Sequence, residues 1–201
     1  MESSLFKRAV AVSAFLLSVT AWGQPAGPRQ PDPVDPHHGE TKANAPGFRP
    51  AATTLGRADR DFVIDAAIAS IAKIELGKLA LEKAVSRGVK DFGERLVTDH
   101  QKANRELERA VAPYAVMLPT QVDLEHQRTF EALKAKKGAD FDAAFIKHLA
   151  ERHQAAIRLF TQEAKSGEAA ALRDFAAATL PVLEEHLKIA RELAKTKTSS
   201  R

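Results

Sequence analysis

Apolar side chains recur at every third or fourth position through most of residues 59–195, which is the period of one face of an α-helix. Polar and charged residues occupy the positions between them, so each segment is amphipathic. Breaks near Gly88, Pro119 and Gly167 divide the pattern into long segments. The predicted long helices cover residues 59–87, 89–115, 141–165 and 168–195.

The break at Pro119 opens the longest connection between these segments. Thr120 and Asp123 have the spacing of a capping box, which predicts a shorter helix over residues 122–136 that Gly138 ends. Long amphipathic helices joined in pairs by tight turns bury their apolar stripes against one another. The pattern therefore predicts an all-α fold: a four-helix bundle built from two helical hairpins, with a short extra helix in the long connection.

One nine-residue pattern occurs twice, in segments that belong to different predicted hairpins. Residues 99–107 read DHQKANREL and residues 185–193 read EHLKIAREL, each with a histidine five residues before Arg-Glu-Leu. The repeat predicts that the second hairpin copies the first. The second copy is three residues longer upstream of its histidine, around Pro181, which is expected to kink its helix.

The N-terminal part of the chain has a different composition. Residues 1–23 combine a basic start, a short apolar run and small residues near the end, which is the organisation of a secretory signal peptide. Residues 24–57 are rich in proline and poor in large apolar residues, which predicts a disordered linker. The bundle then covers residues 58–195, and residues 196–201 form a flexible tail. These boundaries predict a periplasmic or secreted protein, with anchoring in the membrane by an uncleaved signal as the alternative.

Composition excludes several kinds of site and partner. The chain has no cysteine, so disulfides and thiolate ligands are excluded. Its formal net charge is +4, but the basic residues are mixed with acids and lack clustered aromatics, so no nucleic-acid partner is expected. There is no nucleophilic triad and no glycine-rich phosphate loop in the pattern, which disfavours an enzyme. An envelope protein or an anionic surface is the candidate partner, and the oligomeric state is left open.

Each long segment places one ionisable residue near the centre of its apolar stripe: Glu75, His100, His153 and His186. A carboxylate in an apolar core is costly unless it is paired, hydrogen-bonded or bound to a cation. Three imidazoles and one carboxylate form a ligand set that zinc, copper, iron, nickel or manganese accepts. We therefore expect these residues to form a site for one first-row transition metal.

Position along the bundle is a second test of this site. Glu75 and His100 lie at matching distances from the first turn and should face each other. His153 and His186 are offset by about 9 Å at a rise of about 1.5 Å per residue, unless a looser turn or a kink at Pro181 reduces the offset.

A structural role is the alternative for the same residues. A buried pair of Glu75 and His100 would fix the register of the helices without any metal. Secondary candidates for the site are Asp142, which would cap its helix or reach a neighbouring segment, and Asp99 and Glu185, which adjoin the histidines in the sequence.

Four stretches carry a family resemblance: FVIDAAIASIAKIELGKLALEKA, VKDFGERLVTDHQKANREL, GADFDAAFIKHLAERHQAAIRLF and LPVLEEHLKIAREL. They resemble a bacterial exported family of unknown function with a ferritin-like fold, whose members are often labelled putative outer-membrane proteins. The resemblance implies a ferritin-like fold for residues 59–193 and no particular activity. Ferritin-like di-iron proteins carry Glu-x-x-His on two helices. Val97 and Leu183 stand at the glutamate positions of these motifs here, so di-iron chemistry is not expected.

Two functional hypotheses follow from these patterns, and a third is disfavoured. The first is an exported ferritin-like bundle that binds one transition metal in its core, for metal handling or for protection against envelope stress. The alternative is a structural or protein-interaction module of the cell envelope whose buried histidines and glutamate set the helix register. A redox enzyme is disfavoured because the Glu-x-x-His pairs are absent.

Overall fold

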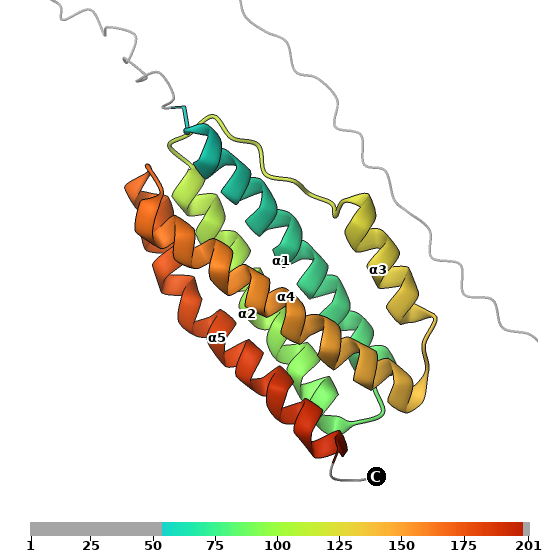
Figure 1. Ribbon diagram of the computed structural model, residues 1–201. Coiled ribbons are helices and arrows are strands. Elements are labelled where there is room, and N and C mark those ends of the chain that lie inside the picture. The colour runs from blue at the N-terminus through green and yellow to red at the C-terminus, as the bar shows by residue number, and fades with distance from the viewer. Residues whose placement is uncertain (1–53, 199–201) are drawn as a thin grey trace, which may run out of the picture. The chain divides into compact units, whose positions relative to one another are not determined.

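The computed structural model describes residues 54–198 of the 201-residue chain, and this described part contains five α-helices and no β-strand (Figure 1). The all-α prediction is confirmed for these residues. The predicted signal peptide, most of the predicted linker and the last residues of the predicted tail lie outside them. The helices are α1 Arg57–Lys83, α2 Arg87–Val111, α3 Leu124–Lys134, α4 Gly138–Ser166 and α5 Ala170–Thr198.

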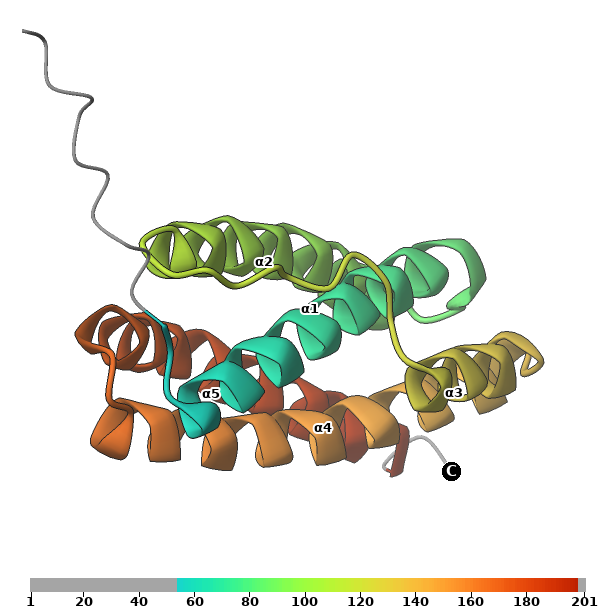
Figure 2. The same ribbon diagram turned by 90° about the horizontal axis from the view of Figure 1, so that it is seen from above.

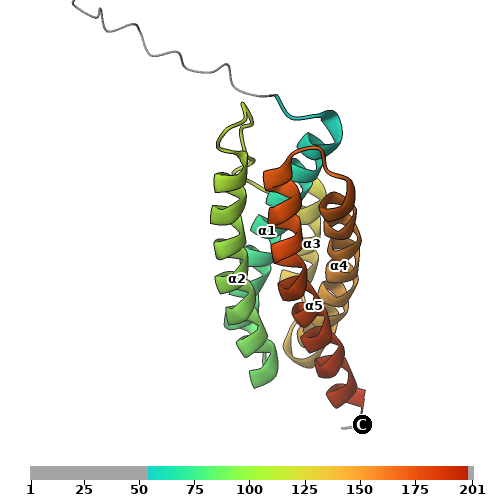
Figure 3. The ribbon, with the colours of Figure 1, turned by 90° about the vertical axis from the view of Figure 1, so that its left-hand side faces the viewer.

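The long helices form two hairpins that pack against each other. Helices α1 and α2 lie side by side around the turn at residues 84–86, and α4 and α5 repeat this arrangement around residues 167–169. Helix α2 also packs against α5, and α1 packs against α4 (Figures 2 and 3). The short helix α3 lies outside the long helices, along α1 and α4. No helix in the described part is both long and apolar enough to cross a membrane.

Helices α1 and α2 approach most closely where Gly77 faces Gly93. A Cβ atom on Gly77 would lie 2.6 Å from the carbonyl oxygen of Gly93, and a Cβ atom on Gly93 would lie 2.8 Å from the carbonyl oxygen of Gly77. Both distances are too short for a side chain, so glycine is required at both positions for this packing distance.

Apolar side chains fill the interior in two clusters, one toward each end of the long helices. One cluster is centred on Phe92 and Phe145, near the turn between α1 and α2. The other is centred on Phe62 and Phe160, near the turn between α4 and α5, and the centroids of these two rings lie 5.0 Å apart in an edge-to-face contact. A buried histidine from each of α2, α4 and α5 lies between the two clusters. The apolar ends therefore hold a polar layer at the middle of the fold.

A buried aspartate from each hairpin holds the turn of the other hairpin. Asp142, near the start of α4, accepts hydrogen bonds from the backbone N–H groups of residues 85 and 86 at 3.2 and 2.9 Å. Asp59, near the start of α1, accepts hydrogen bonds from those of residues 168 and 169 at 3.0 and 2.7 Å. Asp142 lies 83 residues after Asp59, so the two contacts are equivalent in the sequence as well as in space. This symmetry supports the predicted duplication of the hairpin.

Both hairpin turns lie at different positions from those predicted. Helix α1 ends at Lys83 instead of residue 87, because the chain turns at residues 84–86. Helix α5 begins at Ala170 instead of residue 168, because Asp59 binds the backbone N–H groups that precede it. Helix α5 then runs to Thr198 as one helix that contains Pro181.

The short helix also starts later than predicted. The Asp123 carboxylate accepts a hydrogen bond from the backbone N–H of His126 at 2.9 Å, so Asp123 caps α3 and the helix begins at Leu124. Gly138 begins α4 instead of ending α3. Its φ of 54° lies in the left-handed region, where glycine is favoured, and this conformation allows the sharp change of direction between the two helices.

Candidate metal centre

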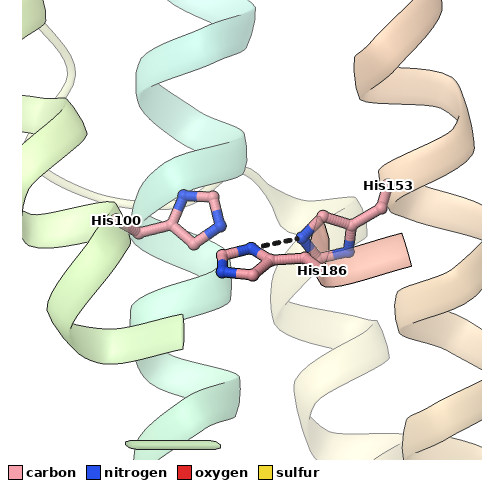
Figure 4. Close-up of side chains that lie close together, drawn as sticks. All are labelled: His100, His153 and His186. Atoms are coloured by element: carbon pink, nitrogen blue, oxygen red, sulfur yellow. Dashed lines mark hydrogen bonds between the residues drawn. The ribbon is translucent and has the colours of Figure 1, made fainter. Parts of the chain in front are cut away.

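Three of the predicted site residues meet in the interior, each from a different helix. His100 comes from α2, His153 from α4 and His186 from α5, and their side chains point toward one another (Figure 4). Their exposed fractions are 5%, 0% and 0%. One ring nitrogen of each histidine lies within 4.8 Å of those of the other two. The fold therefore gathers three imidazoles around one point in the polar layer.

The tautomer of His153 follows from a contact with its own helix. Its Nδ1 atom lies 2.8 Å from the backbone carbonyl oxygen of Leu149. A carbonyl oxygen can only accept, so Nδ1 carries the proton and donates it. In the neutral ring, Nε2 then carries a lone pair, and this atom faces His186.

The tautomer of His186 is set by an aspartate on another helix. Its Nε2 atom lies 2.8 Å from Oδ2 of Asp99 on α2, and Asp99 is also paired with Arg95 at 3.5 Å. The carboxylate can only accept, so Nε2 donates. In the neutral ring, Nδ1 of His186 then carries a lone pair, and it lies 3.2 Å from Nε2 of His153. Asp99 thus follows Thr98 on the same helix as His100 but orients the imidazole of a different hairpin.

The third imidazole, His100, is held by Ser70 on α1. The Ser70 hydroxyl donates to the backbone carbonyl oxygen of His100 at 3.2 Å, and its Oγ atom lies 3.3 Å from Nδ1 of the ring. Because the hydroxyl proton is used on the carbonyl, Oγ accepts from Nδ1–H. The other ring nitrogen, Nε2, is buried and has no hydrogen-bond partner among the described residues.

The three outward nitrogens therefore donate to acceptors, and the three inward nitrogens keep lone pairs. Metal-bound histidines typically donate their second N–H to a carboxylate, a carbonyl or another acceptor in this way. Two nitrogens at about 2.0–2.1 Å from a tetrahedral zinc ion would lie about 3.3 Å apart. The pair from His153 and His186 has nearly this separation at 3.2 Å. The arrangement is chemically able to hold one cation, with a small rotation of the His100 ring.

Burial keeps these imidazoles in the neutral form. Desolvation is the main reason that the pKa values of His100 and His153 lie well below the usual 6.5, and the positive charge of Lys73 lowers both further. Desolvation also lowers the pKa of His186, although its hydrogen bond to Asp99 acts in the opposite direction. A neutral imidazole is the form that binds a metal ion, so little proton competition is expected near neutral pH.

The structure does not bring Glu75 to the histidines. Its side chain is half-buried on another face of α1, beside residues of the long connection that include Gln121, Gln127 and Glu131. These neighbours come from the loop before α3 and from α3 itself, which cover that face of α1. The candidate centre therefore contains three of the four predicted ligands.

The misplacement of Glu75 follows from the predicted end of the first helix. With the helix ending at residue 87, Glu75 is level with His100. Because α1 ends at Lys83 and α2 begins at Arg87, the residue level with His100 is Ser70, thirteen positions before Lys83. The polar partner of His100 on α1 is therefore a hydroxyl and not a carboxylate.

The expected offset between His153 and His186 is also smaller than predicted. His153 lies thirteen residues before the end of α4, and His186 lies sixteen residues after the start of α5. The remaining three residues correspond to about 4.5 Å along a helix. The looser of the two predicted turns is the one observed, because the chain stays extended through residues 167–169.

The remaining secondary candidates lie away from the centre. Asp142 reaches a neighbouring segment, the turn between α1 and α2, which is one of its two expected roles. Glu185 is half-buried, and its carboxylate lies 3.5 Å from the ammonium group of Lys188. Neither side chain belongs to the group that could share a metal ion with the histidines.

Sequence reasoning missed Ser70 and Lys73, although one of them could have been found. His153 lies 83 residues after Ser70, the same separation as between Asp59 and Asp142. Aligning the hairpins at this separation pairs Ser70 with an inward histidine. No comparable signal marks Lys73, because lysine on an amphipathic helix normally faces solvent.

Comparison with known proteins places these observations in a family. Residues 45–193 match a family described as a domain of unknown function, DUF4142. No curated protein matches the chain. Among solved structures, the crystal structure of a DUF305 fragment from Deinococcus radiodurans is similar with a TM-score of 0.63 and 12% sequence identity, and the match covers 72% of this chain and 99% of that chain. At this identity the likeness concerns the fold alone. The family match spans most of the chain and includes all three inward histidines, and on this basis the chain belongs to the DUF4142 family.

Proposed function

We propose that this protein binds one transition-metal ion through His100, His153 and His186 in the core of an exported, ferritin-like helical bundle. The observation that carries the proposal is the direction of the three imidazoles. Their outward nitrogens are all used on acceptors, and their inward nitrogens present lone pairs to one another with no donor between them. A buried cluster of acceptors without a donor is unfavourable, and a bound cation would relieve it.

The donor atoms favour particular metals. Imidazole nitrogen suits zinc, copper, iron and nickel, whereas manganese favours carboxylate, carbonyl and water ligands. With Glu75 elsewhere, the ligand set is three neutral nitrogens and is best matched to zinc or copper. Three protein ligands leave one position of a tetrahedral ion for a water molecule or another small ligand.

The ferritin-like assignment is supported by the connectivity. Two hairpins of long helices are joined by a single long connection that contains α3, and one long crossover is the connection that ferritin-like folds use. Export is supported by the signal-like composition of residues 1–23. A buried metal held in an exported bundle is suited to retention, so we propose metal handling or protection against envelope stress as the role.

Metal titration of the chelator-treated chain tests this proposal. Zinc, copper and nickel are titrated separately into the parent and into His153→Ala and His186→Ala, with binding followed by calorimetry and the bound metal counted by elemental analysis. We expect one ion per chain in the parent and a loss of affinity of about 100-fold or more in each variant, because two nitrogens remain.

His126→Ala is the matched control for this titration. His126 is also partly buried, but its Nδ1 atom lies 2.8 Å from the Asp123 carboxylate at the start of α3, outside the candidate centre. It should bind metal as the parent does. Parent-like binding by either core variant, with both variants folded by circular dichroism, would overturn the proposal.

A structural role for the same histidines is favoured by one observation. A single proton added to His186 would let this ring donate to Asp99 at 2.8 Å and to His153 at 3.2 Å, which satisfies both contacts without metal. In that case the histidines fix the packing of α2, α4 and α5. This alternative predicts that His186→Ala lowers stability and that no metal changes the melting temperature of the parent.

A further inference from the structure

A cavity of about 330 Å³ lies inside the fold between α1, α2, α4 and α5, next to His100. Its volume is at the lower end of the range of about 300–1,000 Å³ that small-molecule sites occupy. The exposed side chains of Asp65 and Asp123 lie at its border, so the cavity is reachable from solvent. Most of its wall is apolar and includes Ala66, Leu76, Leu107, Leu149, Phe160 and Leu183.

One cation is buried in this apolar wall. The side chain of Lys73 lines the cavity, and the residue is only 5% exposed. Its ammonium group donates one hydrogen bond, to the backbone carbonyl oxygen of Ala69 at 3.1 Å. No carboxylate in the described part of the chain forms an ion pair with it, whereas the neighbouring Arg152 is paired with Glu125. The ammonium therefore has unused donors and no counterion in the interior.

Burying an unpaired ammonium group opposes folding. Burial, together with the nearby charge of Arg152, lowers the pKa of Lys73 from 10.5 to about 8. The group still carries a proton most of the time at neutral pH, at a free-energy cost that a neutral side chain of similar length would not have. A bound anion would supply the missing counterion.

We propose that this cavity binds an amphipathic monocarboxylate, with the carboxylate on the Lys73 ammonium group and the hydrocarbon chain along the apolar wall. One buried cation matches one negative charge. A polyanion such as a phosphate would need more donors than the site offers and would meet Asp65 and Asp123 at the border. The apolar wall has no use for a ligand that is polar throughout, which favours a hydrocarbon chain.

The other charged and titratable groups around the cavity leave this assignment intact. Helix α1 contributes Asp65 at the border, and α2 contributes His100, whose pKa is well below its usual value. Helix α4 contributes Arg152 and His148, and the pKa of His148 is lowered to about 4, mainly by burial. Helix α5 lines the cavity with Phe175, Thr179 and Leu183, none of which is charged. Lys73 is thus the buried group that is cationic at neutral pH and has no acidic partner.

Calorimetric titration of the metal-free full chain with octanoate tests the proposal. Octan-1-ol serves as a probe with a comparable chain and no charge, and acetate as a probe with the carboxylate and almost no chain. We expect saturable binding of one octanoate per protein, with both other probes weaker by about tenfold or more, because each lacks one half of the interaction. The metal-free protein is used so that this test and the metal titration succeed or fail separately.

Lys73→Met is the decisive variant, and Lys78→Met is its control on the same helix. Lys78 is exposed, so its replacement should leave octanoate binding unchanged. Lys73→Met removes the buried charge and should weaken octanoate binding by about 30-fold or more. Because the substitution removes an unpaired buried cation, it should also raise the melting temperature, which excludes unfolding as the cause of lost binding.

Proton uptake gives a second, independent readout. At about pH 9 the Lys73 amine of the free protein is mostly neutral, and a bound carboxylate would favour its protonated form. Octanoate binding should therefore take up protons in the parent, measured as a binding enthalpy that depends on the ionisation enthalpy of the buffer, and not in Lys73→Met. Parent-like octanoate affinity in Lys73→Met, equal affinity for octanol, or the absence of saturable binding in the parent would each overturn the proposal.

Discussion

Each inward histidine is held by one acceptor on its outward nitrogen, and these acceptors differ in strength. His153 uses a backbone carbonyl, His100 uses a serine hydroxyl, and His186 uses the Asp99 carboxylate at 2.8 Å. A hydrogen bond to a carboxylate is the strongest of the three and makes the ring a better ligand. At the scale of the residue, Asp99 is therefore the group outside the ligand set with the greatest expected effect on metal affinity.

Asp99→Asn tests this expectation. The substitution removes the charge but keeps a similar shape, and metal affinity should fall by about tenfold or more, as measured by calorimetry. Asp91→Asn is the matched control, because Asp91 is paired with Arg87 one turn earlier in the same arrangement as Asp99 with Arg95, at 3.6 and 3.5 Å. Equal affinities for the two variants would show that the charge of Asp99 does not act on the site.

A second residue-scale prediction concerns Glu163, near the end of α4. The residue is 6% exposed, and its Oε1 atom is buried without a hydrogen-bond partner among the described residues. Burial, followed by the charge of Asp59, raises the pKa of Glu163 from 4.5 to about 7, although Arg173 acts in the opposite direction. The folded state therefore holds this proton more tightly than the unfolded state, and stability is lost as the pH rises from about 4.5 through about 7.

Glu163→Gln should remove this loss. The neutral amide has the same shape, so the variant should be more stable than the parent by about 1–2 kcal/mol near pH 8 and nearly equal to it near pH 4. Urea unfolding at the two pH values measures the difference. Glu151→Gln is the control, because Glu151 is exposed on the same helix and should show no such pH dependence. A Glu163→Gln variant no more stable than the parent near pH 8 would contradict the raised pKa.

At the scale of the helix, the two hairpins are locked together by their reciprocal aspartates. Asp142 binds two backbone N–H groups of the first turn, and Asp59 binds two of the second. The N–H groups that precede a helix have no partner within it, so each carboxylate satisfies groups that would otherwise be exposed or unpaired. Because each aspartate belongs to the opposite hairpin, these contacts also set how far one hairpin slides along the other.

Asp142→Ala should therefore cost more than an ordinary capping change. Asp142 is fully buried, and its removal leaves two N–H groups without their acceptor, so we expect a loss of about 2–4 kcal/mol in the free energy of unfolding. Asp140→Ala, on the exposed side of the same first turn, should produce a much smaller loss. Denaturant unfolding of the two variants compares them, and similar losses would mean that the contact to the turn contributes little.

The ends of the helices, more than their existence, limited what could be predicted of the site. Heptad-like spacing correctly indicated all five helices, because their apolar faces are visible in the sequence. The end of α1 was predicted four residues too late, and this shift replaced Ser70 by Glu75 as the residue opposite His100. No local pattern marks that end, since the contact that holds the turn comes from Asp142, more than 50 residues later.

At the scale of the whole molecule, the candidate centre joins the two hairpins. His100 belongs to the first hairpin, and His153 and His186 belong to the second. A metal ion bound to all three would be bound by the folded state and not by the unfolded chain, where the histidines are far apart. At a free metal concentration about 100 times the dissociation constant, such binding contributes about 2.7 kcal/mol to stability.

Thermal unfolding with and without metal tests this prediction. Zinc should raise the melting temperature of the metal-free parent, and an excess of chelator should return it to the starting value. His186→Ala should show no rise, while His126→Ala should behave as the parent. A rise that persists in His186→Ala would mean that the stabilising ion binds elsewhere.

The sequence alone determined the helical class, the two hairpins and the inward position of three histidines. Periodicity carries this information, because a residue near the centre of an apolar stripe must face the interior wherever the helix packs. The repeated nine-residue pattern also indicated that His100 and His186 hold equivalent places in the two hairpins.

Only the tertiary structure decided which polar groups surround these histidines. Ser70, Asp99 and the carbonyl of Leu149 select the tautomers, and Lys73 is buried beside a cavity instead of facing solvent. These contacts depend on where each turn lies and how one hairpin is placed along the other, and both are set by long-range contacts. A shift of one helical turn along an axis, about 5.4 Å, leaves the apolar pattern intact but changes every polar partner, so the pattern cannot specify them.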